Sequence, residues 1–257
     1  MKGIIKSIFI LTILSFSVLS ACSGGQSADV PPNADHLVQF NEAGIAVIRG
    51  PIESSAWHQP ANGRYDEKIN IAIPIKVDGI RASLTIPIVI SYDTEIASSQ
   101  VPKTTVREHL IFHPRSYVAE VFRNTPLLEV TFRKNGTVFE AVSIKEVEKK
   151  PQLFQTQGTI NGFFQKDSYG RPIAGGSISQ AMKDVDGSAL YWMLSAGIPA
   201  HGVNANVIVQ VKSTPETKIN TSQGTFNRTT DFDWSLVQIV YTRRGGKMIA
   251  KEITALP

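Results

Sequence analysis

The chain has 257 residues and a modest basic excess, with 26 Lys and Arg against 22 Asp and Glu. The formal charge of +4 is too small to favour a nucleic-acid partner, and a single cysteine excludes an internal disulfide. About 220 residues follow the first 36, enough for one large or two small domains with sizeable hydrophobic cores.

The first 22 residues follow the pattern of a secretory signal. Lys2 and Lys6 give a positive start, an apolar run covers residues 8–18, and small residues precede Cys22. The apolar run is shorter than the roughly 20 residues that a membrane-spanning helix needs. We therefore expect residues 1–21 to be a signal peptide rather than a membrane-spanning anchor.

The tetrapeptide Leu19-Ser20-Ala21-Cys22 resembles the lipobox of bacterial lipoproteins. The resemblance implies that Cys22 becomes the acylated first residue of the mature protein, held to a membrane by its lipid. Ser23 follows in place of an aspartate, which by the same resemblance implies the outer membrane if the host is Gram-negative. Residues 22–36 are small, polar or proline after the cysteine, and this composition predicts a flexible spacer.

Recurring turn residues predict two β domains, residues 37–150 and 151–257. Four short segments recur in the same order at offsets of 107 to 110 residues: Gly50-Pro51-Ile52 as Gly158-Thr159-Ile160, Asn62-Gly63-Arg64 as Tyr169-Gly170-Arg171, Val77-Asp78-Gly79 as Val185-Asp186-Gly187, and Arg133–Gly136 as Arg243–Gly246. Collinear matches indicate a tandem duplication, so that the second domain is a duplicate of the first. The competing explanation is coincidence, because glycine turns are common.

The first domain contains the clearest strand signal. Apolar residues alternate from Ile69 to Ile90 around Asp78-Gly79, which is typical of a two-residue hairpin turn. This turn places five cross-strand pairs on one face: Val77–Ile80, Ile75–Ala82, Ile73–Leu84, Ile71–Ile86 and Ile69–Ile88. Pro74 and Pro87 then occupy non-hydrogen-bonded positions, so we expect the neighbouring strands to skip them.

Two further hairpins are predicted near the ends of the domains. One turns at Asn135-Gly136 and pairs Phe132 with Phe139 and Val130 with Ala141, and the other turns at Gly245-Gly246. A capping-box pattern over Thr105–Glu108 predicts a short helix that ends before Pro114.

Part of the second domain has an ambiguous pattern. Ile178, Ala181, Met182 and Val185 have helical spacing, so either a helix replaces a strand here or the repeat alignment fails. Residues 191–194 predict a buried strand. The fold class is therefore mainly β, with two tandem antiparallel β domains, sandwich or barrel-like, and minor helix.

His109 and His113 are the best, though weak, metal candidates, because they share one face if residues 105–113 are helical. Leu110 stands where the zinc-protease pattern requires glutamate, and no third ligand is nearby in the sequence. The competing interpretation is two ordinary surface or half-buried histidines. We expect no metal and no cofactor.

No catalytic residue is identified by motif. The chain has several histidines and many serines but no Gly-x-Ser-x-Gly motif. Candidates for a partner surface are Trp57, His58, Arg64 and His201, each with a turn or core role as the competing interpretation.

The leading functional hypothesis is a non-enzymatic envelope lipoprotein, anchored through Cys22, whose β domains bind a protein or glycan partner of the envelope. The alternative is a lipoprotein hydrolase with a site between the domains that uses His201 or the pair His109 and His113. A buried histidine beside an acidic group in a sizeable cleft would favour the enzyme.

Overall fold

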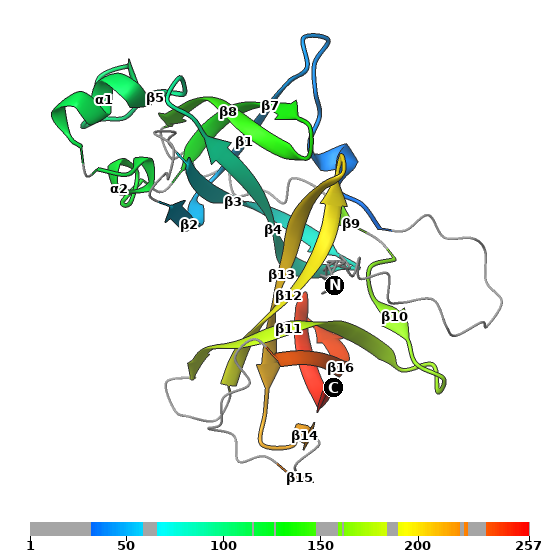
Figure 1. Ribbon diagram of the computed structural model, residues 1–257. Helices are drawn as coiled ribbons and strands as arrows, with labels where there is room; N and C mark the ends of the chain where they lie inside the picture. The colour runs from blue at the N-terminus through cyan, green and yellow to red at the C-terminus, as the bar shows by residue number, and fades with distance from the viewer. Residues whose placement is uncertain are drawn as a thin grey trace, which may run out of the picture. The chain divides into compact units, whose positions relative to one another are not determined.

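The computed structural model describes residues 32–58, 66–114, 116–125, 127–147, 159–160, 162–183, 190–221, 224–225 and 235–256. The predicted signal peptide, Cys22 and most of the predicted spacer lie outside these residues. The chain is mainly β, as predicted. Figure 1 shows the yellow hairpin of residues 190–213 running from the red strands near the C-terminus up to the blue and green strands of the first half of the chain.

The long hairpin of β3 (Asp66–Val77) and β4 (Ile80–Ile90) has the predicted register. All five predicted pairs are present, and Asp78 and Gly79 both have positive φ, at 47° and 82°. The paired apolar side chains are buried, apart from the partly exposed Ala82. The flanking strands also skip both prolines, since β4 pairs with its neighbours at 82–85 and 88–89 and β3 at 66–72 and 76–77.

The first half closes a ring of paired strands. The 3₁₀ helix η1 (Asp35–Leu37) precedes β1 (Ile45–Gly50), which pairs with β7 (Leu128–Asn135). Next along the chain, β2 (Ile52–His58) pairs with β3 instead. The ring is completed because β7 pairs with β8 (Val138–Glu146), and β8 pairs with β4 and with β5 (Glu95–Ala97). Between β5 and β7 come β6 (Thr104–Thr105), α1 (Val106–Phe112) and α2 (Val118–Val121).

The second half closes the same ring. The single strand β11 (Pro172–Lys183) pairs first with β16 (Ser235–Arg244) and then with β12 (Leu190–Ala200). The hairpin of β12 and β13 (Val203–Ser213) corresponds to β3–β4, and the hairpin of β16 and β17 (Lys247–Ala255) to β7–β8. Parallel pairs of β17 with β13 and with β14 (Lys218–Thr221) match those of β8 with β4 and β5. The small strands are β9 (Thr159–Ile160), β10 (Gln165–Lys166) and β15 (Gly224–Thr225).

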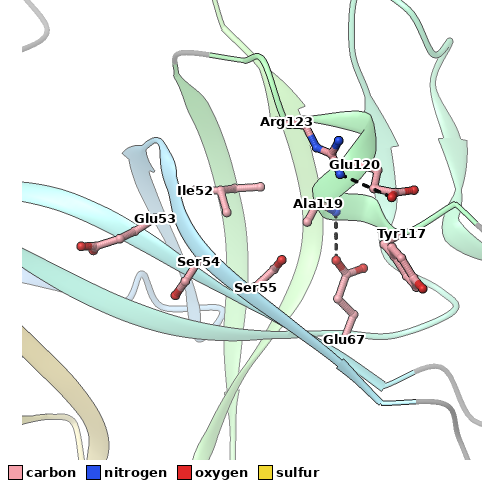
Figure 2. A pocket seen from close by; sticks show the side chains of 9 residues that line it. All are labelled: Ile52, Glu53, Ser54, Ser55, Glu67, Tyr117, Ala119, Glu120 and Arg123. Carbon is pink, nitrogen blue, oxygen red and sulfur yellow. Dashed lines mark hydrogen bonds and ion pairs between the residues drawn. The ribbon is translucent and has the colours of Figure 1, made fainter. Parts of the chain in front are cut away.

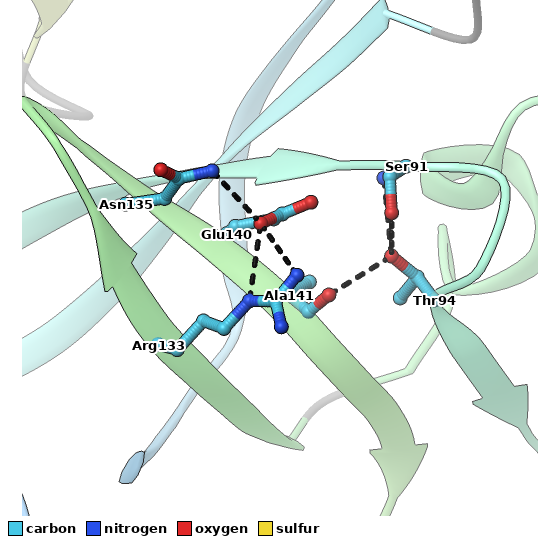
Figure 3. Close-up of polar contacts among 6 residues, drawn as sticks. All are labelled: Ser91, Thr94, Arg133, Asn135, Glu140 and Ala141. Atoms are coloured by element: carbon cyan, nitrogen blue, oxygen red, sulfur yellow. Dashed lines mark hydrogen bonds and ion pairs between the residues drawn. The ribbon is translucent and has the colours of Figure 1, made fainter. Parts of the chain in front are cut away.

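We call residues 34–147 and 159–256 the first and second repeat. A threonine hydroxyl makes the same two hydrogen bonds in each. Thr94 accepts from the Ser91 amide and donates to the Ala141 carbonyl, both at 3.1 Å. Figure 3 shows the bond to Ala141 and the contact of 3.4 Å between the Ser91 and Thr94 hydroxyls. Thr217 accepts from the Thr214 amide and donates to the Ala250 carbonyl, both at 2.9 Å. Both threonines are buried, and each hydroxyl finds its hydrogen-bond partners within the protein.

A glycine marks the point where a strand passes from one partner to the other in each repeat. A Cβ on Gly50 would collide with the Ala72 carbonyl oxygen, and a Cβ on Gly176 with the Ser195 carbonyl oxygen. Both glycines therefore allow the close backbone approach at which the strand changes its partner.

The two repeats are joined by an antiparallel ladder and by reciprocal contacts at the hairpin turns. Residues 82–85 of β4 pair with 206–209 of β13. The Asp78 carboxylate accepts the amides of Gly162 and Phe164 from the second repeat, at 2.9 and 3.0 Å. At the other turn, the amide of His201 donates to the Asp35 carboxylate of the first repeat at 2.5 Å. Each repeat thus forms hydrogen bonds to the turn of the other repeat's central hairpin.

Two sequence predictions need correction, and one open alternative is resolved. For residues 177–183, of the two alternatives left open, the helix is ruled out, because their backbone pairs with β12 as part of β11; Val185 lies outside the described residues. In the β7–β8 hairpin the turn is Gly136-Thr137, so Phe132 faces Ala141, and a bulge beside Thr131 shifts the register. The turn equivalent to Asp78-Gly79 is His201-Gly202, with φ of 48° and 77°, and not Asp186-Gly187, which also lies outside the described residues.

The hairpin around Gly245-Gly246, the helix after Thr105 and the strand over 191–194 are confirmed. The folded part begins earlier than predicted, since Ala34 is fully buried and its amide bonds to the Pro199 carbonyl. Residues 31–257 form a single compact unit of contacts, and a boundary at residue 150 and a duplication in the chain's history stay predictions.

Candidate functional site

The two repeats differ in the length of the segment that follows the short strand after the central hairpin. In the first repeat residues 98–127 link β5 to β7, whereas in the second the shorter segment 222–234 links β14 to β16. The longer segment contains α1 and α2, which lie together at one end of the first repeat (Figure 1). The second repeat closes its ring of strands with a shorter segment, so the extra length in the first repeat is a candidate for function.

Local sequence explains why α1 begins where it does. The Thr105 hydroxyl accepts the Glu108 amide at 3.2 Å, and the Glu108 carboxylate accepts the Thr105 amide at 3.0 Å. This capping box satisfies amides at the helix start that have no partner within the helix. Hydrogen bonds to the Glu108 carboxylate lower its pKa, with the bond from the Thr105 amide as the largest cause and the bond from the Thr104 hydroxyl next.

Glu67 of β3 fixes the position of α2. Its side chain is fully buried, and its two oxygens accept the amides of Val118 and Ala119 at 2.8 and 2.9 Å. Figure 2 shows the carboxylate directed at the first turn of α2. A buried carboxylate is costly unless it is hydrogen-bonded, and here those bonds tie a short helix to the central hairpin.

A groove of about 490 Å³ lies between α2 and strand β2. Its strand wall consists of residues 52–55, its helix wall includes Tyr117, Ala119 and Arg123, and Glu67 lies between them (Figure 2). Ser54 and Ser55 are exposed. Within the described part of the chain, β2 pairs with β3 alone, so the groove runs along a sheet edge.

The groove carries more negative than positive formal charge. Glu53, Glu67 and Glu120 line it, against the single cation Arg123. Glu53 accepts the Thr85 hydroxyl at 2.6 Å, and the ion pair between Glu120 and Arg123, at 3.5 Å, is exposed to solvent. Exposed pairs of this kind contribute little to stability, so both side chains are available to reorient around a ligand.

Two buried positions beside the groove carry different residues in the second repeat. Ile69 of β3 corresponds to Trp192 of β12, whose indole is 1% exposed and donates to the Ser213 hydroxyl at 2.9 Å. Glu67 corresponds to Leu190, also buried. The second repeat therefore places a large aromatic and an aliphatic side chain where the first places a smaller residue and a carboxylate.

His109 and His113 share one face of α1, as predicted, with ring centroids 4.8 Å apart. His109 is 8% exposed, and burial, followed by the charge of His113, lowers its pKa. Its Nε2 lies 3.3 Å from the Ser116 hydroxyl, a contact that links α1 to the turn before α2. Over the described ranges, no carboxylate hydrogen-bonds to either ring, and no three His, Cys, Asp or Glu side chains form a metal-ligand group.

His201 lies where the repeats meet, and its ring is engaged with backbone. Nε2 lies 3.0 Å from the Asp35 carbonyl and 2.5 Å from the Val38 carbonyl, so it must carry the proton that it donates to them. The ring also packs edge-on against Phe40 at 5.1 Å. These contacts hold η1 against the hairpin turn.

For the other predicted surface residues, the structure describes no side chain and therefore places none at the groove. Trp57 and His58 belong to β2 by their backbone, but their side chains lie outside the described residues, as does all of Arg64. The groove residues were missed because no motif joins them. One signal was present in the sequence. Glu67 alternates with Ile69 and Ile71 on the buried face of the strand, and a carboxylate at such a position needs a hydrogen-bond or ion-pair partner.

Comparison with known proteins gives no family for the chain. No protein-family model matches it, and no curated protein matches it significantly. In the described part of the chain, no helix has the length and apolar character needed to cross a bilayer.

Proposed function

We propose that the chain is a membrane-anchored binding component of the cell envelope that acts without catalysis and recognises a partner protein through the groove between β2 and α2. The observation that carries this proposal is the difference in length of one segment between two repeats that share their main strand pairings. The helix wall of the groove belongs to the segment that is longer in the first repeat, and grooves beside added helices and loops are common binding sites.

The proposed anchor is the acylated Cys22, and the proposed location is the outer membrane of a Gram-negative host. Nine residues, hence ten Cα–Cα steps, lie between Cys22 and Pro32, the first described residue. Fully extended, this stretch would reach about 35 Å. That length leaves the groove free to meet a partner beyond the headgroups of the bilayer.

A cross-linked pull-down of the lipidated full chain from its native envelope tests the function. Ser54→Arg places a long cation on the exposed wall of the groove, and the matched control is Ser179→Arg, at the equivalent position of the second repeat. We expect a stoichiometric partner with the wild type and the control, and its loss with Ser54→Arg. Equal recovery with both variants, or no partner from correctly anchored wild type, contradicts the proposal.

A further inference from the structure

We infer that the groove takes an extended segment of the partner as an added strand on β2, with a lysine or arginine side chain of that segment inserted between β2 and α2. This inference rests on the proposed function and names the chemistry of its partner. Strand addition to an open sheet edge uses main-chain hydrogen bonds for affinity and side-chain pockets for specificity.

The backbone of β2 presents its hydrogen-bonding groups at this edge. The amide of Ala72 donates to the Pro51 carbonyl at 3.0 Å, so even-numbered residues of this part of β3 direct their amides toward β2. Asn70 pairs with Ser54 in the same register. Ser54 therefore bonds inward to β3, and the amide and carbonyl of Ser55 point outward, toward the groove edge.

The groove selects the side chain of the added strand by charge and by shape. Three carboxylates and one guanidinium line it, which favours a cation over an anion or a neutral group. Ile52, Ala119 and the ring of Tyr117 offer apolar contact along the walls. A lysine or arginine meets both requirements, because its stem packs against apolar surface while its charged end stays among polar groups.

Within the part of the chain that the structure describes, β2 has no strand partner other than β3. Its other edge can therefore accept the proposed segment. An open strand edge otherwise invites non-specific pairing. Glu53, Ser54 and Ser55 are exposed on β2. These polar side chains disfavour non-specific pairing at this edge until a matching segment binds.

The test uses the full chain and a phage-displayed library of random nine-residue peptides. Enriched peptides should alternate apolar and polar residues around a lysine or arginine. Ser55→Pro, which removes the outward amide and leaves the β3 ladder intact, should weaken their binding at least tenfold, while Ser55→Ala should not. Glu120→Gln should weaken lysine-containing peptides severalfold more than their lysine-to-norleucine versions.

Enrichment of acidic or uncharged peptides, equal binding to Ser55→Pro and Ser55→Ala, or no enrichment would each overturn the inference. Recovery of the native partner with Ser54→Arg and with Ser55→Pro distinguishes failure of this inference from failure of the proposed function. A partner that Ser54→Arg releases but Ser55→Pro retains keeps the groove as the binding site and removes strand addition. A partner indifferent to both variants removes the groove itself.

Discussion

Leu84 of β4 pairs with Val207 of β13, and each residue is the other's equivalent in the two repeats. Each lies on the second strand of its central hairpin, at the same distance from its turn. An antiparallel ladder centred on two equivalent residues has approximate two-fold symmetry, as in the interface of a homodimer. The contacts at the turns follow the same symmetry, since each repeat supplies a short segment that binds the hairpin turn of the other.

We expect the two repeats to associate when they are not covalently linked. Segments 22–150 and 151–257, co-expressed with an affinity tag on one, should copurify in equal amounts, because the ladder and the turn contacts bury both central hairpins. Leu84→Asp, which would place a charge at a fully buried position, should abolish copurification. A tagged segment that elutes alone in native form would contradict the interlocked arrangement.

Gly176 should be far less tolerant of a side chain than Gly197. In Gly176→Ala the new Cβ would meet the Ser195 carbonyl, and we expect the free energy of unfolding to fall by about 1–3 kcal/mol. Gly197→Ala meets nothing within 4 Å and should change it by less than about 1 kcal/mol. Urea denaturation of both variants measures the difference, and similar losses would show that the partner change of β11 does not depend on close approach.

Glu67→Gln should loosen α2 without unfolding the sheet. An amide in place of the carboxylate leaves one of the two backbone amides, Val118 or Ala119, facing a donor, at a local cost of about 1–3 kcal/mol. Hydrogen exchange should accelerate at residues 118–121 and stay slow in β3 and β4. The control is Glu53→Gln, on the opposite wall of the groove, which should leave exchange in α2 unchanged.

His109 should make the protein less stable in mild acid. Its folded-state pKa is lowered from 6.5, so below that pH the unfolded chain binds more protons than the folded chain, and the free energy of unfolding falls as the pH falls. Urea midpoints at pH 7.5 and 5.5 should differ more for the wild type than for His109→Gln. His113→Gln should reduce the difference only in part, because burial is the larger cause of the shift.

Sequence patterns predicted the elements whose signals are local. The β3–β4 register follows from strict alternation around Asp78-Gly79, and the start of α1 follows from Thr105 and Glu108. Of the two alternatives left open near Ile178, the helix does not form because pairing with β12 and β16 overrides local spacing. The equivalence of His201-Gly202 and Asp78-Gly79 was missed because a histidine at positive φ carries a weak turn signal.

The groove was beyond sequence reasoning for a related reason. Its walls come from β2 and α2, far apart in the chain, and the link between α2 and the hairpin is the side chain of Glu67. The spacing of these residues in the sequence does not predict the contact. The charge composition does not predict it either, since the three carboxylates of the groove come together only on folding.

The most direct test of the account is photo-cross-linking in the native envelope from p-benzoylphenylalanine placed at position 54 or at position 179. These positions are equivalent serines of the two repeats, paired with Asn70 and Met193. The account predicts a discrete cross-linked partner from position 54 and none from position 179. The same cross-links from both positions, or a partner from position 179 alone, would contradict it.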